Sequence, residues 1–238
     1  MPRTPRAVRA GGVYHVLNRG NGRAELFHKP ADFDAFLRVL AQGLDRYPVD
    51  LFAWCLMSNH WHLVLRPRRG GAGGGAATLA RFMGWVGVTH VRRHHEHHHT
   101  RGGGHLYQGR FKSFPLQDDR HFLAVCRYVE SNPLRAGIVR RAENWPHSSL
   151  RWSAGLTASQ PPVPLAPWPV DRPPHWLSRV NEPLPDDDLE RLRTSVRRGR
   201  PFGDDAWTKA TAGRLGLTHT LRGPGRPRKA AAAPAGNQ

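Results

Sequence analysis

Two histidines separated by one residue, His60 and His62, are the clearest candidates for chemistry in this sequence. Alternate side chains of a β-strand point to the same face, so both imidazoles would share one face and Trp61 would lie on the other. Two imidazoles placed in this way can bind a single metal ion. The alternative for an isolated His-x-His string is a half-exposed strand with two incidental histidines.

Tyr128 and Asn132 form a second candidate group, four residues apart in a segment with helical periodicity. Residues at this spacing are neighbours on the surface of a helix. A phenol is a poor nucleophile unless a metal or a base assists it, and an amide oxygen one turn away can serve as a third metal ligand. Each residue also has a structural alternative, Tyr128 as an aromatic residue at the core edge and Asn132 as the C-cap of a helix that Pro133 ends.

Breaker residues and apolar periodicity predict the elements that must position these side chains. The predicted strands cover 13–20, 49–56, 60–65 and 106–114, and the predicted helices cover 30–47, 79–90 and 117–133. This order predicts an α+β fold of the ferredoxin-like type, in which helices pack on one face of an antiparallel sheet. Cys55 and Cys126 lie in apolar patterns 71 residues apart, which favours reduced core residues over a disulfide.

Two glycine-rich or histidine-rich segments are predicted to be loops. Gly70–Gly75 is typical of a flexible linker. The run from His94 to His99 contains five histidines, which indicates a solvated loop. Binding of a transition metal by this run is the alternative, but a low-complexity loop would give its ligands no fixed geometry.

The charge of the chain points to nucleic acid as its partner. Against 36 Lys and Arg residues there are 18 Asp and Glu residues, a formal net charge of +18 that a polyanion would offset. No apolar stretch is long enough to span a membrane, and the N-terminus lacks the apolar region of a secretory signal. These features predict a cytoplasmic protein with no membrane partner.

Composition changes beyond Trp152 and divides the chain into 1–152, 153–190 and 191–238. The middle part contains nine prolines, which predicts an arm that is wrapped on the core or trails from it. The last part contains Arg198-Gly199-Arg200-Pro201 and Gly225-Arg226-Pro227-Arg228-Lys229. Both strings resemble the core of AT-hooks, whose extended arginines enter the DNA minor groove. The alternative is a basic, disordered tail that binds phosphates without sequence preference.

Five ordered blocks between Val13 and Ser149 resemble the single-tyrosine HUH transposases, and within them the REP-associated tyrosine transposases of bacteria. The blocks are Tyr14-His15-Val16 with Asn18-Arg19-Gly20, Ser58-Asn59-His60-Trp61-His62, Gln108-Gly109-Arg110-Phe111-Lys112, Tyr128 through Val139, and Trp145-Pro146-His147-Ser148-Ser149.

This resemblance implies both a fold and an activity. It implies a ferredoxin-like HUH core in which His60 and His62 hold a divalent metal, and Asn132 completes the site at a position where the superfamily also uses Gln. Mg²⁺ or Mn²⁺ suits such a mixed nitrogen and oxygen site. It implies that Tyr128 becomes attached to the 5′ side of a cut DNA strand, so that single-stranded DNA is cleaved and rejoined beside hairpins of the repetitive extragenic palindrome (REP) type.

The resemblance also sets the expected partners and the rival functions. We expect a nucleoid-associated bacterial protein, acting as a monomer or a homodimer, with Tyr107 as the competing candidate nucleophile. A replication or relaxase-type nickase and a non-catalytic DNA-binding regulator are the alternatives. Expected DNA contacts are Arg19, Arg110, Lys112, Arg198, Arg200, Arg226, Arg228 and Lys229.

Overall fold

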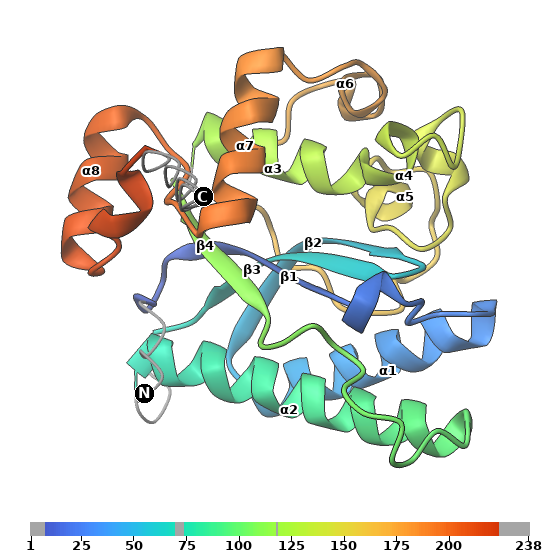
Figure 1. Cartoon of the computed structure of the whole chain (residues 1–238). Helices are drawn as coiled ribbons and strands as arrows, with labels where there is room; N and C mark the ends of the chain where they lie inside the picture. The colour runs from blue at the N-terminus through green and yellow to red at the C-terminus, as the bar shows by residue number, and fades with distance from the viewer. Residues whose placement is uncertain (1–7, 70–73, 118, 224–238) are drawn as a thin grey trace, which may run out of the picture.

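A four-stranded antiparallel sheet forms the centre of the molecule (Figure 1). The structure is a computed structural model that describes residues 8–69, 74–117 and 119–223. The strands are β1 (Val13–Arg19), β2 (Val49–Met57), β3 (His60–Pro67) and β4 (Lys112–Leu116), in the spatial order β2-β3-β1-β4. With α1 (Pro30–Arg46) between β1 and β2 and α2 (Gly74–His97) between β3 and β4, the chain has the predicted ferredoxin-like order.

Helices cover both faces of this sheet, so the prediction that they pack on one face is wrong (Figure 1). Helices α1 and α2 lie on one face, where Trp61, Leu63 and Leu65 of β3 join their core. Helix α3 (Arg120–Glu130) lies on the other face with Val64. The physical reason lies in β2, which is buried at every position and therefore needs cover on both sides.

Two predicted boundaries differ from those of the structure. Helix α2 continues through His97, so His94 and His97 are helical and the predicted histidine loop is wrong at its start. The apolar stripe of α2 continues at helical spacing through His90, which is buried. The fourth strand begins only at Lys112, six residues later than predicted. Of the predicted glycine linker, residues 70–73 lie outside the described residues, and Gly74 and Gly75 begin α2.

The predicted helix over 117–133 divides at Ser131 into α3 and the short α4 (Asn132–Arg135). The side chain of Asp119 caps α3 by accepting a 2.8 Å hydrogen bond from the His121 N–H. Pro133 does not end a helix, because it lies in the first turn of α4, where a missing N–H costs nothing. The remaining elements are η1 (Asn21–Arg23), η2 (Ala142–Asn144), α5 (Leu150–Ser153), α6 (Trp176–Asn181), α7 (Asp186–Arg198), α8 (Asp205–Arg214) and η3 (Thr218–Leu221).

The C-terminal extension covers both edges of the sheet. At the β2 edge, the Ala166 N–H donates to the Leu51 carbonyl at 2.8 Å. At the β4 edge, the Phe202 N–H donates to the Pro115 carbonyl at 2.9 Å, and the Phe202 carbonyl accepts from the Gln117 N–H at 3.0 Å. Unpaired edge strands are templates for aggregation, so this arrangement protects the sheet. The proline-rich arm thus lies on the core, and a boundary at 190/191 falls within α7.

The two cysteines are free residues of the core, as predicted. Cys55 on β2 and Cys126 on α3 are both buried between the sheet and α3. Burial in apolar surroundings raises the pKa of both thiols, so neither is a reactive thiolate near neutral pH.

A buried carboxylate connects α3 to the extension. The Glu130 carboxylate accepts hydrogen bonds of 2.7 Å from the Ser149 hydroxyl, the Ser153 hydroxyl and the Trp176 indole N–H. Burial raises the pKa of Glu130, while these three donors favour its charged form. The side chain therefore joins α3, α5 and α6 through buried hydrogen bonds.

We expect Glu130→Gln to lower the free energy of unfolding by about 1–3 kcal/mol. The amide has one acceptor oxygen, so one of the three donors loses its partner inside the core. Urea denaturation measures the change. Glu190→Gln, a change at an exposed side chain of α7, is the control and should shift stability by less than about 0.5 kcal/mol. Equal effects of the two substitutions would contradict a stabilising role for the buried network.

Candidate functional site

Strand β3 places His60 and His62 on the face of the sheet that carries α3. Their ring centroids are 5.1 Å apart, and Trp61 is buried on the opposite face. In the sheet register His60 lies opposite Arg19 of β1, and His62 lies opposite Leu17. The two imidazoles predicted to share a strand face are therefore neighbours.

Each of these histidines uses its Nδ1 atom in a hydrogen bond. His60 Nδ1 lies 2.6 Å from the Asn59 side-chain oxygen, which can only accept, so Nδ1 is the donor. His62 Nδ1 lies 2.8 Å from Nε2 of His15 on β1. Donation through Nδ1 leaves Nε2 unprotonated and able to bind a metal. This is the tautomer of His60, and His62 has it when its Nδ1 donates to His15 Nε2.

His15 is a site residue that the sequence analysis did not single out. Its imidazole is fully buried, stacks on His62 with ring centroids 4.9 Å apart, and leaves Nδ1 without a partner among the described residues. The available signal was its place in the Tyr14-His15-Val16 block of the family resemblance. Its position indicates that it orients the His62 ring.

All three imidazoles are neutral at physiological pH. Burial, reinforced by the positive charge of Arg135, lowers the pKa of His15 to about 3. Burial, with the charges of Arg19 and Arg135, lowers the pKa of His60 to about 4. The pKa of His62 is lowered well below its usual value by burial and by the neighbouring histidines. A neutral imidazole is the form that ligates metal, so protons do not compete for these atoms.

Tyr128 of α3 packs directly against this histidine group. Its ring centroid lies 6.0 Å from that of His62 and 6.2 Å from that of His15, with the rings nearly perpendicular. The residue is 8 % exposed. The Arg135 guanidinium lies over the Tyr128 ring at 3.9 Å and donates to the Tyr128 carbonyl. Arg135 therefore places a positive charge beside both the phenol and the histidines, a role that the sequence analysis missed.

The other three tyrosines of the chain lie on the opposite side of the sheet. Tyr14 and Tyr107 are buried in the core beneath α1 and α2, and Tyr47 packs against that core. The Tyr107 hydroxyl accepts from the Trp61 indole N–H at 3.0 Å and pairs with His90 Nδ1 at 2.7 Å. Burial raises the pKa of Tyr107, which opposes formation of a phenolate. The candidate nucleophiles are thus separated by the sheet itself.

Asn132 is the first residue of α4 and is 8 % exposed. It follows Tyr128 by four residues across the junction at Ser131, so the two do not share one continuous helix as predicted. Its role as a metal ligand remains a prediction.

The predicted basic residues of the core divide between the two faces. The charge of Arg19 acts on His60 and His62, and Lys112 is exposed on β4 opposite Leu17. Arg110 precedes β4 and does not alternate with Lys112 on a strand. It lines a groove along α2 with Val88 and Phe111, away from the histidine pair.

The first AT-hook-like string is not an extended arm. Arg198 ends α7 and donates to the Arg222 carbonyl, and Gly199 caps the helix with φ of 73°. Arg200 follows, and then Phe202 pairs with the β4 edge. The left-handed backbone conformation at a helix C-cap favours glycine. Gly199 is therefore explained by its place at the end of α7. Arg226, Arg228 and Lys229 of the second string lie outside the described residues.

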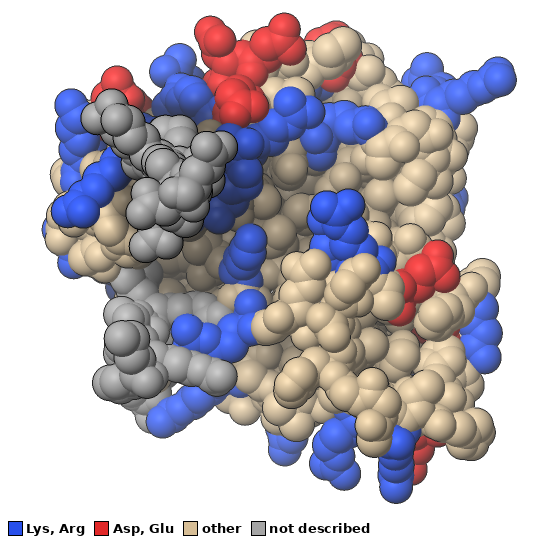
Figure 2. Space-filling model, in the orientation of Figure 1, with Lys and Arg blue, Asp and Glu red and all other residues tan. Residues whose placement is uncertain are grey.

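Positive charge is spread over much of the surface in Figure 2. Acidic side chains gather mainly at the top of this view, near the start of α7, which carries Asp186, Asp187 and Asp188 in its first turn. Basic side chains line the hollow between the upper and lower layers. Among the described helices, none combines the length and the apolar character needed to cross a membrane.

Comparisons with known proteins identify the family and a similar fold. Residues 10–132 match the model of the family described as IS200-like transposases, a match that includes β1, the His60–His62 pair and Tyr128. A solved structure described as a REP-associated tyrosine transposase bound to a REP hairpin has a similar fold, with a TM-score of 0.51 and 15 % sequence identity. The match covers 72 % of this chain and 94 % of that chain. No curated protein matches the chain in sequence.

Proposed function

Because this chain belongs to the IS200-like transposase family, we propose that it cleaves and rejoins single-stranded DNA beside hairpins, with Tyr128 as the nucleophile. The observation that carries this proposal is the position of Tyr128. Of the four tyrosines it is the one that packs against the His15 and His62 rings, and the other three lie across the sheet. Tyr128 is therefore the tyrosine that lies beside the His60–His62 pair.

The cleavage step exchanges one phosphate ester bond for another. The Tyr128 hydroxyl oxygen attacks the phosphorus of a phosphodiester, and the bond from phosphorus to the 3′ oxygen breaks. The phenol proton goes to solvent, and the departing 3′ oxygen takes up a proton as a free 3′-OH. The 5′ phosphate remains bound to Tyr128, and attack by a 3′-OH on this phosphotyrosine reverses the step and rejoins the strand.

His60 and His62 fit the divalent metal that this chemistry implies. Both rings are neutral and make their hydrogen bonds through Nδ1, and Nε2 of each ring and the side chain of Asn132 are the proposed ligands. A bound Mg²⁺ or Mn²⁺ would polarise a phosphate oxygen and offset charge in the transition state. His15 and Asn59 hold the two imidazoles in orientation through their Nδ1 atoms.

The basic residues around the site fit a polyanionic substrate. Arg135 lies over the Tyr128 ring, where its charge would stabilise a developing phenolate and the attacked phosphate. Arg19 and Lys112 lie on the same side of the sheet as the histidine pair and are proposed phosphate contacts. Hairpin recognition is proposed from the solved structure of similar fold, whose description names a bound REP hairpin.

The test uses the full chain and a labelled hairpin oligonucleotide with single-stranded flanks. We expect cleavage only with Mg²⁺ or Mn²⁺. We also expect a covalent protein–DNA adduct that survives denaturation and holds the fragment whose 5′ phosphate was at the cut, while the other fragment has a free 3′-OH. Hairpin binding without cleavage under any divalent ion would instead favour the DNA-binding regulator.

We expect the combined substitution Arg226→Ala, Arg228→Ala and Lys229→Ala to weaken DNA binding and flatten its salt dependence. Each lost phosphate contact removes roughly 0.9 from the slope of log K against log salt on duplex DNA, and about 0.7 on single strands. Binding measured over a salt series checks this. Substitution is preferable to truncation at 153, because Val163, Trp176 and Phe202 belong to the core. An unchanged slope would show that these residues contact no phosphate.

A further inference from the structure

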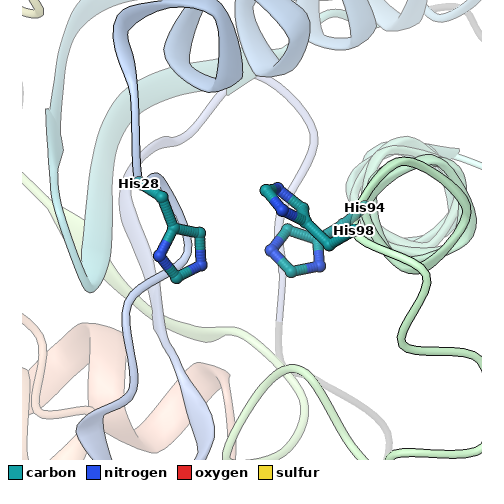
Figure 3. A group of neighbouring side chains, drawn as sticks. All are labelled: His28, His94 and His98. Atoms are coloured by element: carbon teal, nitrogen blue, oxygen red, sulfur yellow. The ribbon is translucent and has the colours of Figure 1, made fainter.

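Three imidazoles converge on the side of the sheet away from Tyr128. Figure 3 shows His94 and His98 extending from the end of α2 toward His28, which lies in the segment before α1. One ring nitrogen from each of the three residues lies within 4.8 Å of the others. His94 and His98 are four residues apart, the spacing that places two ligands on one helix face. We propose that His28, His94 and His98 form a second metal site, which takes a borderline transition ion such as Zn²⁺.

His94 gives the strongest indication that this cluster binds a metal ion. Both of its ring nitrogens are buried, and neither has a hydrogen-bond partner among the described residues. Its ring centroid lies 4.4 Å from that of His98 and 6.1 Å from that of His28. Buried polar atoms nearly always have a partner, so an imidazole with none is an exception that a metal ion would explain.

The donor set selects the class of ion. Imidazole nitrogen suits Zn²⁺, Ni²⁺, Cu²⁺ and Co²⁺, whereas Mg²⁺ and Ca²⁺ prefer oxygen. Tetrahedral Zn²⁺ with bonds of about 2.0–2.1 Å needs ligand atoms about 3.3 Å apart, so binding would draw the three rings inward from their present spacing of up to 4.8 Å.

The surroundings of the cluster favour a bound cation. Asp32 lies at the start of α1, with its carboxylate 3.6 Å from His98 Nε2 and 3.9 Å from His97 Nε2. The same carboxylate accepts hydrogen bonds from the N–H groups of His28 and Lys29, which fixes it beside the cluster. The C-terminal end of α2 also contributes the negative end of its helix dipole.

A metal at this place would join the end of α2 to the segment that supports the β2–β3 turn. The N–H groups of Leu26 and Phe27 donate to the Ser58 carbonyl at 2.7 and 3.1 Å, and Ser58 lies two residues before His60. The ion would therefore act as a structural clamp, distinct from the pair formed by His60 and His62. This inference does not depend on the proposed DNA cleavage.

The experiment measures metal binding in a chain whose other histidine pair is absent. In an untagged His60→Ala and His62→Ala background, we expect one equivalent of Co²⁺ to give the visible absorption of a tetrahedral site. Zn²⁺ should displace it and raise the thermal unfolding midpoint. Adding His94→Ala to this background should weaken Zn²⁺ binding at least tenfold. Adding His28→Ala instead should have the same effect, and this side chain is 48 % exposed, so its loss should change stability little.

The matched control is His95→Ala, in the same histidine run but bonded to the Thr100 hydroxyl and not part of the cluster. It should leave Zn²⁺ affinity unchanged. Absence of binding in the background chain would overturn the proposal. So would equal losses in all three histidine variants, because they would indicate non-specific binding by a histidine-rich segment.

Discussion

Tyr128→Phe binds hairpin DNA with nearly unchanged affinity and forms no covalent adduct; this is the largest effect that we expect from a single change. The substitution removes one oxygen and keeps the ring that packs against His62 and beneath Arg135. Folding and DNA binding should therefore persist while the atom that attacks phosphorus is lost. Denaturing gel analysis of a labelled oligonucleotide measures the adduct, and a gel-shift titration measures binding.

Tyr107→Phe is the matched control. It removes the hydroxyl that pairs with Trp61 and His90 in the opposite core, so it should lower stability but retain the adduct. An adduct that survives in Tyr128→Phe and disappears in Tyr107→Phe would refute the assignment of the nucleophile.

The second large effect is expected at the metal ligands. His60→Ala and His62→Ala should each lower the cleavage rate about 10³-fold, because a metal that polarises a phosphoryl oxygen supplies several kcal/mol of transition-state stabilisation. Hairpin affinity should change little, since phosphate contacts are spread over the surface. Single-turnover cleavage over a Mg²⁺ and Mn²⁺ series, with gel-shift binding in parallel, separates the two effects. Normal cleavage by either variant would place the metal site elsewhere.

His15 provides a graded control for the same site. His15→Leu removes the partner of His62 Nδ1 and should weaken metal affinity about 10–100-fold. His15→Gln can present an oxygen near the position of the lost Nε2, so we expect it to recover part of that affinity. Metal affinity measured by calorimetry distinguishes orientation of His62 from a purely structural role, in which the two variants would differ only in stability.

The sequence predicted the resemblance to a transposase family and the order of strands and helices of an antiparallel α+β fold, because both depend on local patterns. Strand alternation places His60 and His62 on one face whatever surrounds the strand. The ferredoxin-like order follows from the sequence of strands and helices, and the family match over residues 10–132 agrees with it.

Long-range packing decided what local patterns could not. Whether Tyr107 or Tyr128 lies beside the histidines depends on which face of the sheet each segment covers. Tyr107 lies in the core with α1 and α2, and Tyr128 lies on the other face with α3. His15 joins the site because the pairing of β1 with β3 places it against His62. Arg135 joins it because α4 turns back after α3 and places the guanidinium over the Tyr128 ring.

The histidine run and the C-terminal segment show the same limit. The sequence predicted a solvated, low-complexity loop at His94 and His98. In the structure α2 continues to His97, and His28 lies beside these two histidines. Arg198-Gly199-Arg200-Pro201 has the composition of a DNA-binding arm, but in the folded chain it ends a helix and leads into the covered sheet edge. Composition and periodicity report the preferences of a segment alone, whereas its conformation also depends on the surfaces that distant residues offer it.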